Sequence, residues 1–412
     1  MHQAVLLFSI GFAFQFIFLA NGDVVNHYPY ISPDGFDWYM EGVYFDKLLS
    51  GAKLPELPVL RPPFFVFITA ADYLAGGRGV VLALFLGLSI FFTYYFSLKL
   101  IDSAYSGEPS EAWYAVPLAI SLTVYPMNFI KPYLLADGIA IAFSLASVFL
   151  IIKYDIDDRI RILAFSVVVA AISGMTQTYG LIPYFVSCVV GFLYCYQSKR
   201  SKAKKFILAI LSTLVIYLSL TLLWRRFLPH EATPKNFDLL KISIDMFGFY
   251  LSTWGYYFIP LILFFSIFRR YKIVWDISRI VIPSSAITVI FFALLCLSYQ
   301  WPEARFTYYF WPWMIILLFS AIRFESNKGA YFISAVFLLV VFIVPNNYWA
   351  PSWQSMRVTM FQNWIGNYFG SSPIDRKLDV CGDDCDGRND FLNNSDPYVN
   401  NTVKIYNYIK GL

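Results

Sequence analysis

The sequence contains little charge, and this excludes several classes of protein before any motif is considered. Only 14% of its 412 residues are charged, whereas 58% are hydrophobic and 20% are aromatic. These proportions exclude a disordered chain and argue against an ordinary soluble domain. The formal net charge of +4 identifies no partner by itself, because the distribution of charges along the chain matters more.

Other common sequence features are also missing. We find no internal repeat and no low-complexity tract in the chain. Residues 1–20 are apolar but have no basic leader and are followed by no clear small-residue cleavage site. We therefore interpret them as a first membrane span rather than as a signal peptide.

Long apolar runs are what the sequence has in abundance. A helix needs about 20 residues to cross a bilayer core of about 30 Å, and runs of about this length recur along the chain. They predict an all-α, polytopic membrane protein with about eleven transmembrane helices. We place these helices at residues 4–20, 78–100, 112–129, 133–152, 160–176, 178–196, 206–224, 250–268, 279–298, 306–322 and 329–345.

The connections between the apolar runs fall into two alternating classes. Four are short and basic, with the sequences "KYDIDDRIR", "QSKRSKAKK", "FRRYK" and "RFESNK". The positive-inside rule assigns them to the cytoplasm. The other class is longer and richer in acidic and aromatic residues: 21–77, 225–249, 299–305 and the tail 346–412. We therefore expect a transmembrane domain over residues 1–345, with a long outer loop at 21–77, and a small extracytoplasmic tail at 346–412.

Two segments of the first outer loop are expected to form helices at the membrane interface. The stretch "FDWYMEGVYFDKLL" brings aromatic and aliphatic side chains near one helical face. Segment 62–75 is apolar but short and begins with two prolines, which are tolerated in the first turn of a helix.

The five cysteines divide into two groups. Cys188, Cys195 and Cys296 lie inside apolar runs and are interpreted as small core residues. Cys381 and Cys385 form "CGDDC" in the tail, where an oxidising compartment would favour a disulfide; two free thiols are the alternative. The acidic tail lacks the spacing of a calcium loop, so we predict no metal site and leave divalent-metal dependence open.

Acidic and basic residues gather at the predicted outer ends of the spans. Asp34 and Asp37 follow the first span, and Arg61 precedes a proline pair. The simplest explanation of the two aspartates is a solvated loop with aromatic residues at the headgroup level. The simplest explanation of Arg61 is a side chain that extends towards the lipid headgroups. However, a carboxylate can take a proton from an attacking hydroxyl, and a guanidinium can hold a phosphate.

The same pattern recurs further along the chain. Lys131 and Asp137 flank the start of the span at 133–152, and Glu303 and Arg305 occupy a short outer loop. Ionisable groups at membrane depth are costly and usually face a protein interior or a wet cavity. A surface ion pair of little energetic value is the alternative for the loop residues. A further arginine pair, at positions 225 and 226, closes a span on the predicted outer side.

Taken in order, these motifs resemble the GT-C class of membrane glycosyltransferases, in particular the protein O-mannosyltransferases and the lipid A aminoarabinose transferase. The matching segments are "PDGFDWYMEGVYFDKLLSGAKLP", "LRPPFFVFITAADYLAGG", "LLADGIAIAFSLASVFLI", "ISGMTQTYGLIPYF" and "PEARFTYYFWP". The resemblance covers roughly residues 1–320. It departs from the family at the first motif, which reads Asp-Gly where many relatives read Asp-Glu.

The resemblance implies an inverting transfer of a sugar from a polyprenyl-phosphate donor to an extracytoplasmic acceptor. Asp34 or Asp37 would be the catalytic base. The candidates for binding the donor phosphate would be Arg61, Lys131 or Arg305, with Asp137 and Glu303 as residues that orient the others. It also implies a multi-pass protein of a bacterial inner membrane with its site on the periplasmic face. We find no Asp-x-Asp pair beside a nucleotide fold, as this donor class would predict.

Other functions stay open at this point. A transporter or flippase for lipid-linked saccharides would share the interfacial charges, although its ionisable groups are expected nearer the membrane midplane. A saccharide polymerase or ligase commonly relies on arginines in a large late loop, whereas the longest loop here is the first. The sugar is not identified by the sequence, and the acceptor could be a glycan, a lipid-linked saccharide or a protein.

Overall fold

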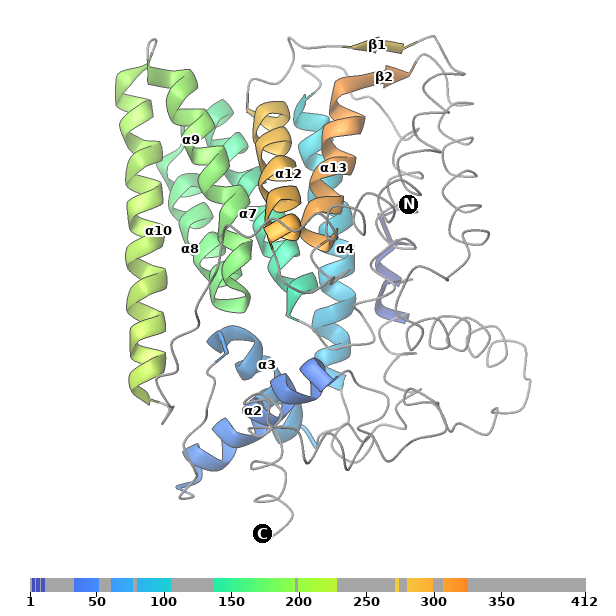
Figure 1. Cartoon of the computed structure of the whole chain (residues 1–412), viewed down its shortest axis with the longest axis vertical. Helices are drawn as coiled ribbons and strands as arrows, with labels where there is room; N and C mark the ends of the chain where they lie inside the picture. Colours follow the sequence, from blue (N-terminus) through green and yellow to red (C-terminus); the bar gives the residue numbers. More distant parts are fainter. Residues whose placement is uncertain are drawn as a thin grey trace, which may run out of the picture.

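The computed structural model describes residues 2–3, 5–7, 9–11, 33–51, 61–76, 80–104, 136–196, 199–227, 271–273, 280–298 and 307–324. Nearly all of them are helical (Figure 1). The helices are α2 (Pro33–Leu49), α3 (Pro63–Leu74), α4 (Val80–Ala104), α7 (Asp137–Asp157), α8 (Ile160–Thr176), η3 (Thr178–Leu181), α9 (Ile182–Tyr196), α10 (Arg200–Phe227), α12 (Val281–Ser298) and α13 (Thr307–Ala321).

Four of the described helices are long and apolar enough to cross a membrane: α4, α7, the continuous η3–α9 segment and α10. The prediction of a helical membrane protein is confirmed at this level. The predicted spans 160–176 and 178–196 coincide with α8 and with η3–α9, and helices cover five further predicted spans with shifted ends. The predicted spans 112–129, 250–268 and 329–345, and most of 4–20, lie outside the described residues.

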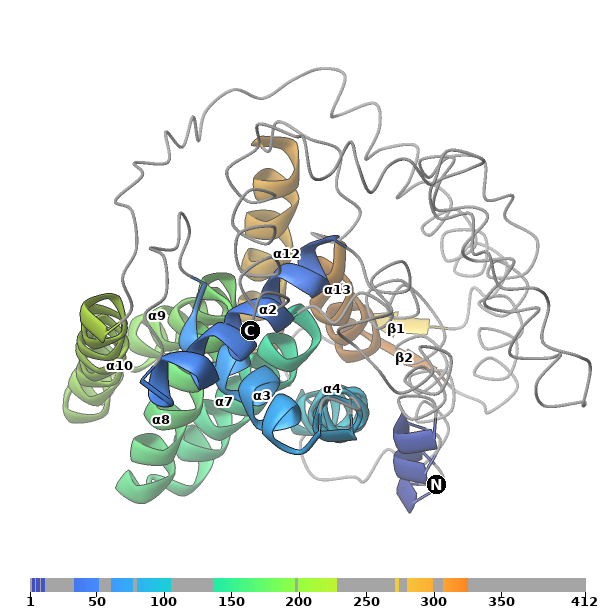
Figure 2. The same cartoon turned by 90° about the horizontal axis from the view of Figure 1, so that it is seen from below.

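Both predicted interfacial segments form helices. Residues 33–49 form α2, and residues 63–74 form α3, which begins directly after Pro62. Neither helix stands upright in the bundle: both lie across one end of it (Figures 1 and 2). We call this the α2–α3 end and the opposite one the basic end.

The consecutive helices α7, α8, α9 and α10 run alternately towards the two ends of the bundle (Figure 1). The turn between α7 and α8 and the connection between α9 and α10 are therefore both at the basic end, whereas Asp137 and the end of α10 are at the α2–α3 end. The two classes of connection that the sequence distinguishes thus separate in space among the described residues. Which end faces the cytoplasm stays a prediction of the positive-inside rule.

A short two-stranded ribbon at the basic end is an addition to the all-helical prediction. Strand β1 (Tyr271–Ile273) pairs antiparallel with β2 (Ile322–Phe324), and Lys272 lies opposite Arg323. Strand β2 directly follows α13, and β1 precedes α12. The pairing could not be read from two three-residue segments that lie about 50 positions apart, because it depends on how α12 and α13 pack together.

A small polar residue makes a direct contact between two helices of the bundle. The hydroxyl of Ser173 on α8 donates a hydrogen bond of 2.8 Å to the carbonyl of Ala140 on α7. Such contacts are typical of membrane bundles, where lipid offers the backbone no alternative partner. Cys188 and Cys195 are buried free thiols, as predicted for small core residues. Apolar side chains cover the exposed surface of α10, including Leu208, Leu211, Val215, Leu218 and Leu222.

Candidate functional site

The two aspartates predicted to be catalytic lie in the first turns of α2. Proline at position 33 suits the start of a helix, and an acidic residue in the first turn interacts favourably with the helix dipole. Positions 34, 37 and 41 follow an i, i+3, i+7 spacing, so they form one stripe along α2. The side chains of Asp34 and Asp37 lie outside the described part of the structure, whereas that of Glu41 is described.

A glycine sets the distance between α2 and α3. A β-carbon at Gly42 would lie 2.1 Å from Thr69 Oγ1 and 2.6 Å from the backbone nitrogen of Ala70. No real side chain is accommodated at these distances, so only glycine allows this approach. The close packing holds the helix that carries the aspartates against the helix that begins just after Arg61.

Arg61 is held by a carboxylate of α2. Its backbone nitrogen donates a hydrogen bond of 3.2 Å to Glu41 Oε2, and its Nε lies 3.9 Å from Glu41 Oε1. The Glu41 side chain has no exposed surface, and 14% of the Arg61 side chain is exposed. A buried carboxylate needs such a partner, because an isolated charge in this environment would be costly. Arg61, which was predicted to bind phosphate, therefore contacts Glu41, on the same stripe of α2 as positions 34 and 37.

The end of α10 is fastened to the same residue. The indole nitrogen of Trp224 donates a hydrogen bond of 2.9 Å to the carbonyl oxygen of Arg61. Its ring lies 5.3 Å from that of Phe45 on α2 and 5.2 Å from that of Phe67 on α3. The two residues that follow Trp224 are Arg225 and Arg226, which are exposed in the last turn of α10. The arginine pair at positions 225 and 226 thus directly follows, in the chain, the residue that contacts Arg61.

These contacts also fix the direction of α2. Because Phe45 packs against Trp224, the carboxyl-terminal half of α2 lies at α10. The amino-terminal turns, with positions 34 and 37, consequently lie at the far end of the helix, on the side of α12 and α13 (Figure 2).

A second buried carboxylate lies at the same end of the bundle. Asp137 is in the first turn of α7, as the sequence predicts, and only 4% of it is exposed. Its Oδ1 accepts a hydrogen bond from the hydroxyl of Tyr309 on α13, and the amide nitrogen of Gln177 lies 3.5 Å from the same oxygen. The Tyr309 ring is stacked on that of Phe292 with centroids 5.2 Å apart. The Asp137 carboxylate thereby links α7 to α13 and to Gln177, the residue between α8 and the 3₁₀ turn η3. Through Tyr309 it is also joined to α12.

The remaining predicted site residues lie outside the described residues: Lys131, Glu303, Arg305, Cys381 and Cys385. Within the described part, no group of three or more His, Cys, Asp or Glu side chains is placed to hold a metal ion.

The sequence analysis assigned no role to Glu41, Gln177, Trp224 or Tyr309, which make polar contacts between elements at the α2–α3 end. The spacing of Glu41 from the two aspartates was a usable signal, because i+7 returns to the same helical stripe. The aromatic residues carried no such signal, since one residue in five of the chain is Phe, Trp or Tyr.

The described geometry positions Arg61 and the helical turns that carry Asp34 and Asp37, but it does not by itself specify a reaction. Comparison of the chain with protein-family models, with curated proteins and with solved structures found no match.

Proposed function

We propose that this protein is an inverting glycosyltransferase that moves a sugar from a polyprenyl-phosphate donor to an acceptor at the α2–α3 end. One observation carries the proposal: α2, with two aspartates in its first turns, lies across the end of an apolar helical bundle and holds Arg61 through Glu41. A lipid-linked donor would reach such a site from the bilayer, with its phosphate at the level of these charges.

In the proposed reaction, Asp34 or Asp37 accepts the proton of an acceptor hydroxyl. The hydroxyl oxygen attacks the anomeric carbon, and the bond from that carbon to the phosphate oxygen breaks on the opposite face. The electron pair leaves with the lipid phosphate, which is already a good leaving group and needs no general acid. A single displacement inverts the configuration, in contrast to the two-carboxylate chemistry of glycoside hydrolysis.

Stabilising the departing phosphate is the task of nearby cations. Arg61 is oriented by Glu41 and by the hydrogen bond from Trp224, so its position is set by two elements. Arg225 and Arg226 are exposed at the α10 end of α2, away from the turns that carry Asp34 and Asp37, so we keep them only as a second candidate pair, outside the set assigned below. The sequence adds Lys131, a few residues before α7, and Arg305, just before α13. We assign the donor phosphate to this set of cations, with Asp137 and Glu303 as orienting residues.

The proposed acceptor is a glycan, a lipid-linked saccharide or a protein on the extracytoplasmic side, which we assign to the α2–α3 end. This assignment follows from the basic residues at the opposite end. We place the protein in a bacterial inner membrane on the strength of the resemblance to the lipid A aminoarabinose transferase and its relatives.

The decisive experiment is transfer by purified protein from radiolabelled polyprenyl-phosphate sugars, with Asp34→Asn and Asp37→Asn assayed side by side. We expect one of the two variants to lose transfer by about 100-fold or more, as for removal of a general base. Asp46→Asn on the same helix is the matched control, and it should retain transfer because position 46 lies on a different stripe.

Two results would count against this function. Full transfer by both aspartate variants would show that the base is elsewhere in the chain. No consumption of any polyprenyl-phosphate sugar, combined with movement of a lipid-linked saccharide across proteoliposome membranes, would favour a flippase.

A further inference from the structure

The basic end of the bundle has a hollow of its own, remote from the proposed site. It has a volume of about 530 Å³ and lies at the turn between α7 and α8. Its lining residues are Lys153, Asp157, Arg159, Ile160, Arg161 and Ile162. Three cations and one carboxylate therefore face a single space, which leaves an excess of positive charge.

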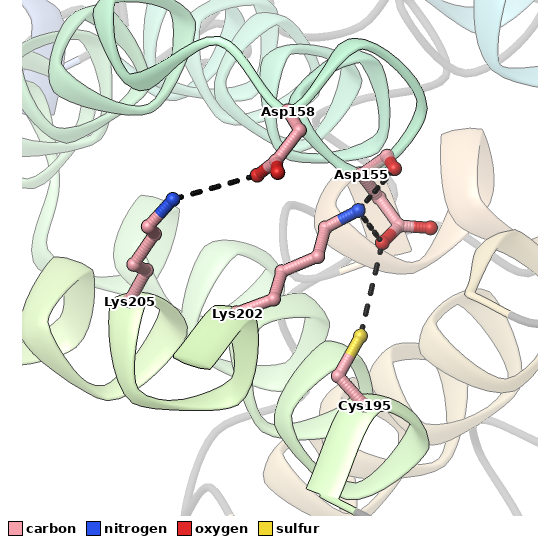
Figure 3. Close-up of polar contacts among 5 residues, drawn as sticks. All are labelled: Asp155, Asp158, Cys195, Lys202 and Lys205. Carbon is pink, nitrogen blue, oxygen red and sulfur yellow. Dashed lines mark hydrogen bonds and ion pairs between the residues drawn. The ribbon is translucent and has the colours of Figure 1, made fainter. Parts of the chain in front are cut away.

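Two neighbouring lysines at this end, Lys202 and Lys205, are already engaged, as Figure 3 shows. Lys202 Nζ lies 2.8 Å from Asp155 Oδ1 and also donates to the Asp155 carbonyl. Lys205 Nζ lies 3.5 Å from Asp158 Oδ1. These pairs join α10 to the end of α7 and neutralise two of the acidic residues of the connection.

The three cations that line the hollow differ from Lys202 and Lys205, which form ion pairs with aspartates. Among the described residues, no carboxylate lies within ion-pair distance of Lys153, Arg159 or Arg161. All three side chains are exposed, so they are available to a partner from outside the chain.

The backbone of the turn explains why the three cations converge. Asp158 adopts a left-handed conformation with φ of 52°, and its backbone nitrogen donates a hydrogen bond of 2.8 Å to the Tyr154 carbonyl. This closes α7, and after one extended residue, Arg159, helix α8 begins. The short turn thus sets the carboxyl-terminal part of α7, where Lys153 lies four residues before the helix end, beside the first turn of α8, with Arg161.

An apolar surface continues from the hollow along α8. Ile160 is 54% exposed, Phe165 is 59% exposed and Val168 is 47% exposed. Their positions fall on one side of the helix, the side on which Arg161 also lies, given about 100° of rotation per residue. A cationic hollow with an apolar track leading away from it matches a molecule with an anionic head and a hydrocarbon chain.

We propose that this hollow binds the phosphate headgroup of an anionic phospholipid, with an acyl chain along Ile160, Phe165 and Val168. Positive charge close to the membrane surface attracts anionic lipids and should do so less at high salt. The apolar track favours a lipid over free phosphate, which would gain nothing from it. The inference does not depend on the proposed transferase activity, because it concerns the opposite end of the bundle.

The test is binding of phosphatidylglycerol to the full-length protein in detergent, measured by native mass spectrometry. Phosphatidylcholine of equal chain length is the zwitterionic comparison, and inorganic phosphate is the competitor. We expect the triple variant K153Q/R159Q/R161Q to lose affinity for phosphatidylglycerol by about tenfold or more. The matched control K199Q/R200Q/K204Q removes the same charge from exposed positions of the α9–α10 region at the same end, and it should lose less than about twofold.

Three outcomes would overturn the proposal. Equal losses in the two triple variants would mean that overall surface charge attracts the lipid. If the unaltered protein bound phosphatidylcholine as tightly as phosphatidylglycerol, the hollow would not discriminate between headgroups by their charge. Displacement of the lipid by equimolar phosphate would assign the hollow to a free anion. The variant R159K/R161K keeps the positive charge and should retain binding. Retained binding would show that replacing these two arginines does not by itself unfold the protein.

Discussion

The hydroxyl group of Tyr309 donates a hydrogen bond to Asp137, although the two residues are 172 positions apart in the chain. The contact joins the first turn of α13 to the first turn of α7, and Gln177 approaches the same oxygen from the end of α8. A carboxylate with only 4% exposure needs donors of this kind, because burial without them is costly. The α2–α3 end is therefore organised around polar contacts between helices that are remote in sequence.

Replacing Tyr309 by phenylalanine should destabilise the fold. The substitution keeps the ring that stacks on Phe292 but removes a hydrogen bond to buried Asp137, at a cost of about 1–3 kcal/mol. The measurement is the midpoint of thermal or denaturant unfolding in detergent. Tyr217→Phe is the control: its hydroxyl lies 3.0 Å from Thr178 Oγ1 in an exposed position, so its loss should cost less than about 0.5 kcal/mol. Equal effects of the two substitutions would contradict the importance of the Asp137 contact.

The pair formed by Glu41 and Arg61 predicts an asymmetric response to mutation. Arg61→Gln leaves a carboxylate without its cation in a position where the side chain has no exposed surface, and should cost on the order of 3 kcal/mol. Glu41→Gln should cost less, because an amide oxygen can still accept the hydrogen bond from the Arg61 backbone. Unfolding midpoints of both single variants and of the double variant test this order. An Arg61→Gln variant as stable as the parent would show that the pair contributes nothing.

The contact between α2 and α3 should not tolerate a side chain at position 42. Gly42→Ala forces the added carbon onto Thr69 and the Ala70 backbone, so the helices must separate at a cost of about 1–3 kcal/mol. Gly138→Ala is the control, since its β-carbon would meet only Ser89 Oγ at 3.6 Å, an ordinary contact. It should be neutral or stabilise α7 by up to about 1 kcal/mol. The comparison needs only the two unfolding curves, and similar destabilisation by both would refute the packing argument.

The ion pair of Asp158 with Lys205 predicts a pH dependence of stability. Desolvation acts to raise the pKa of Asp158, but the Lys205 ammonium, the Tyr154 hydroxyl and the Lys202 ammonium together outweigh it, and the pKa lies below its ordinary value of 3.8. For a lowered pKa, the stabilisation is present above pH 3.8 and is lost as the pH falls through the folded-state value. Asp158→Asn should therefore lower the melting temperature at pH 7 but not in strong acid.

Asparagine is the suitable replacement because it tolerates the left-handed conformation of residue 158. Asp157→Asn in the same turn is the control for removing a carboxylate: among the described residues no cation pairs with Asp157, so its replacement should change the melting temperature at pH 7 less than Asp158→Asn does. A difference between parent and Asp158→Asn that stays constant from pH 7 to strong acid would contradict the role of the ion pair.

Part of the candidate site was predictable from sequence. The placement of Asp34 and Asp37 in a helix at one end of the bundle, and that of Asp137 at the start of a span, follow from local patterns of charge and apolarity. Their partners do not follow from such patterns. Arg61 was assigned to a phosphate, and the structure places Glu41 beside it; neither the spacing nor the chemistry of the chain distinguishes these two partners in advance.

For the part of the chain that the structure describes, the sequence by itself determined where the long apolar helices lie and how charge is distributed between the two ends of the bundle. A helix satisfies its backbone hydrogen bonds within its own segment, so a long apolar run carries sufficient information to predict it. Only the tertiary structure decided which polar groups meet: Glu41 with Arg61, Trp224 with the Arg61 carbonyl, and Tyr309 with Asp137. These contacts depend on the packing of helices that are distant in the chain, and no local pattern of residues encodes that packing.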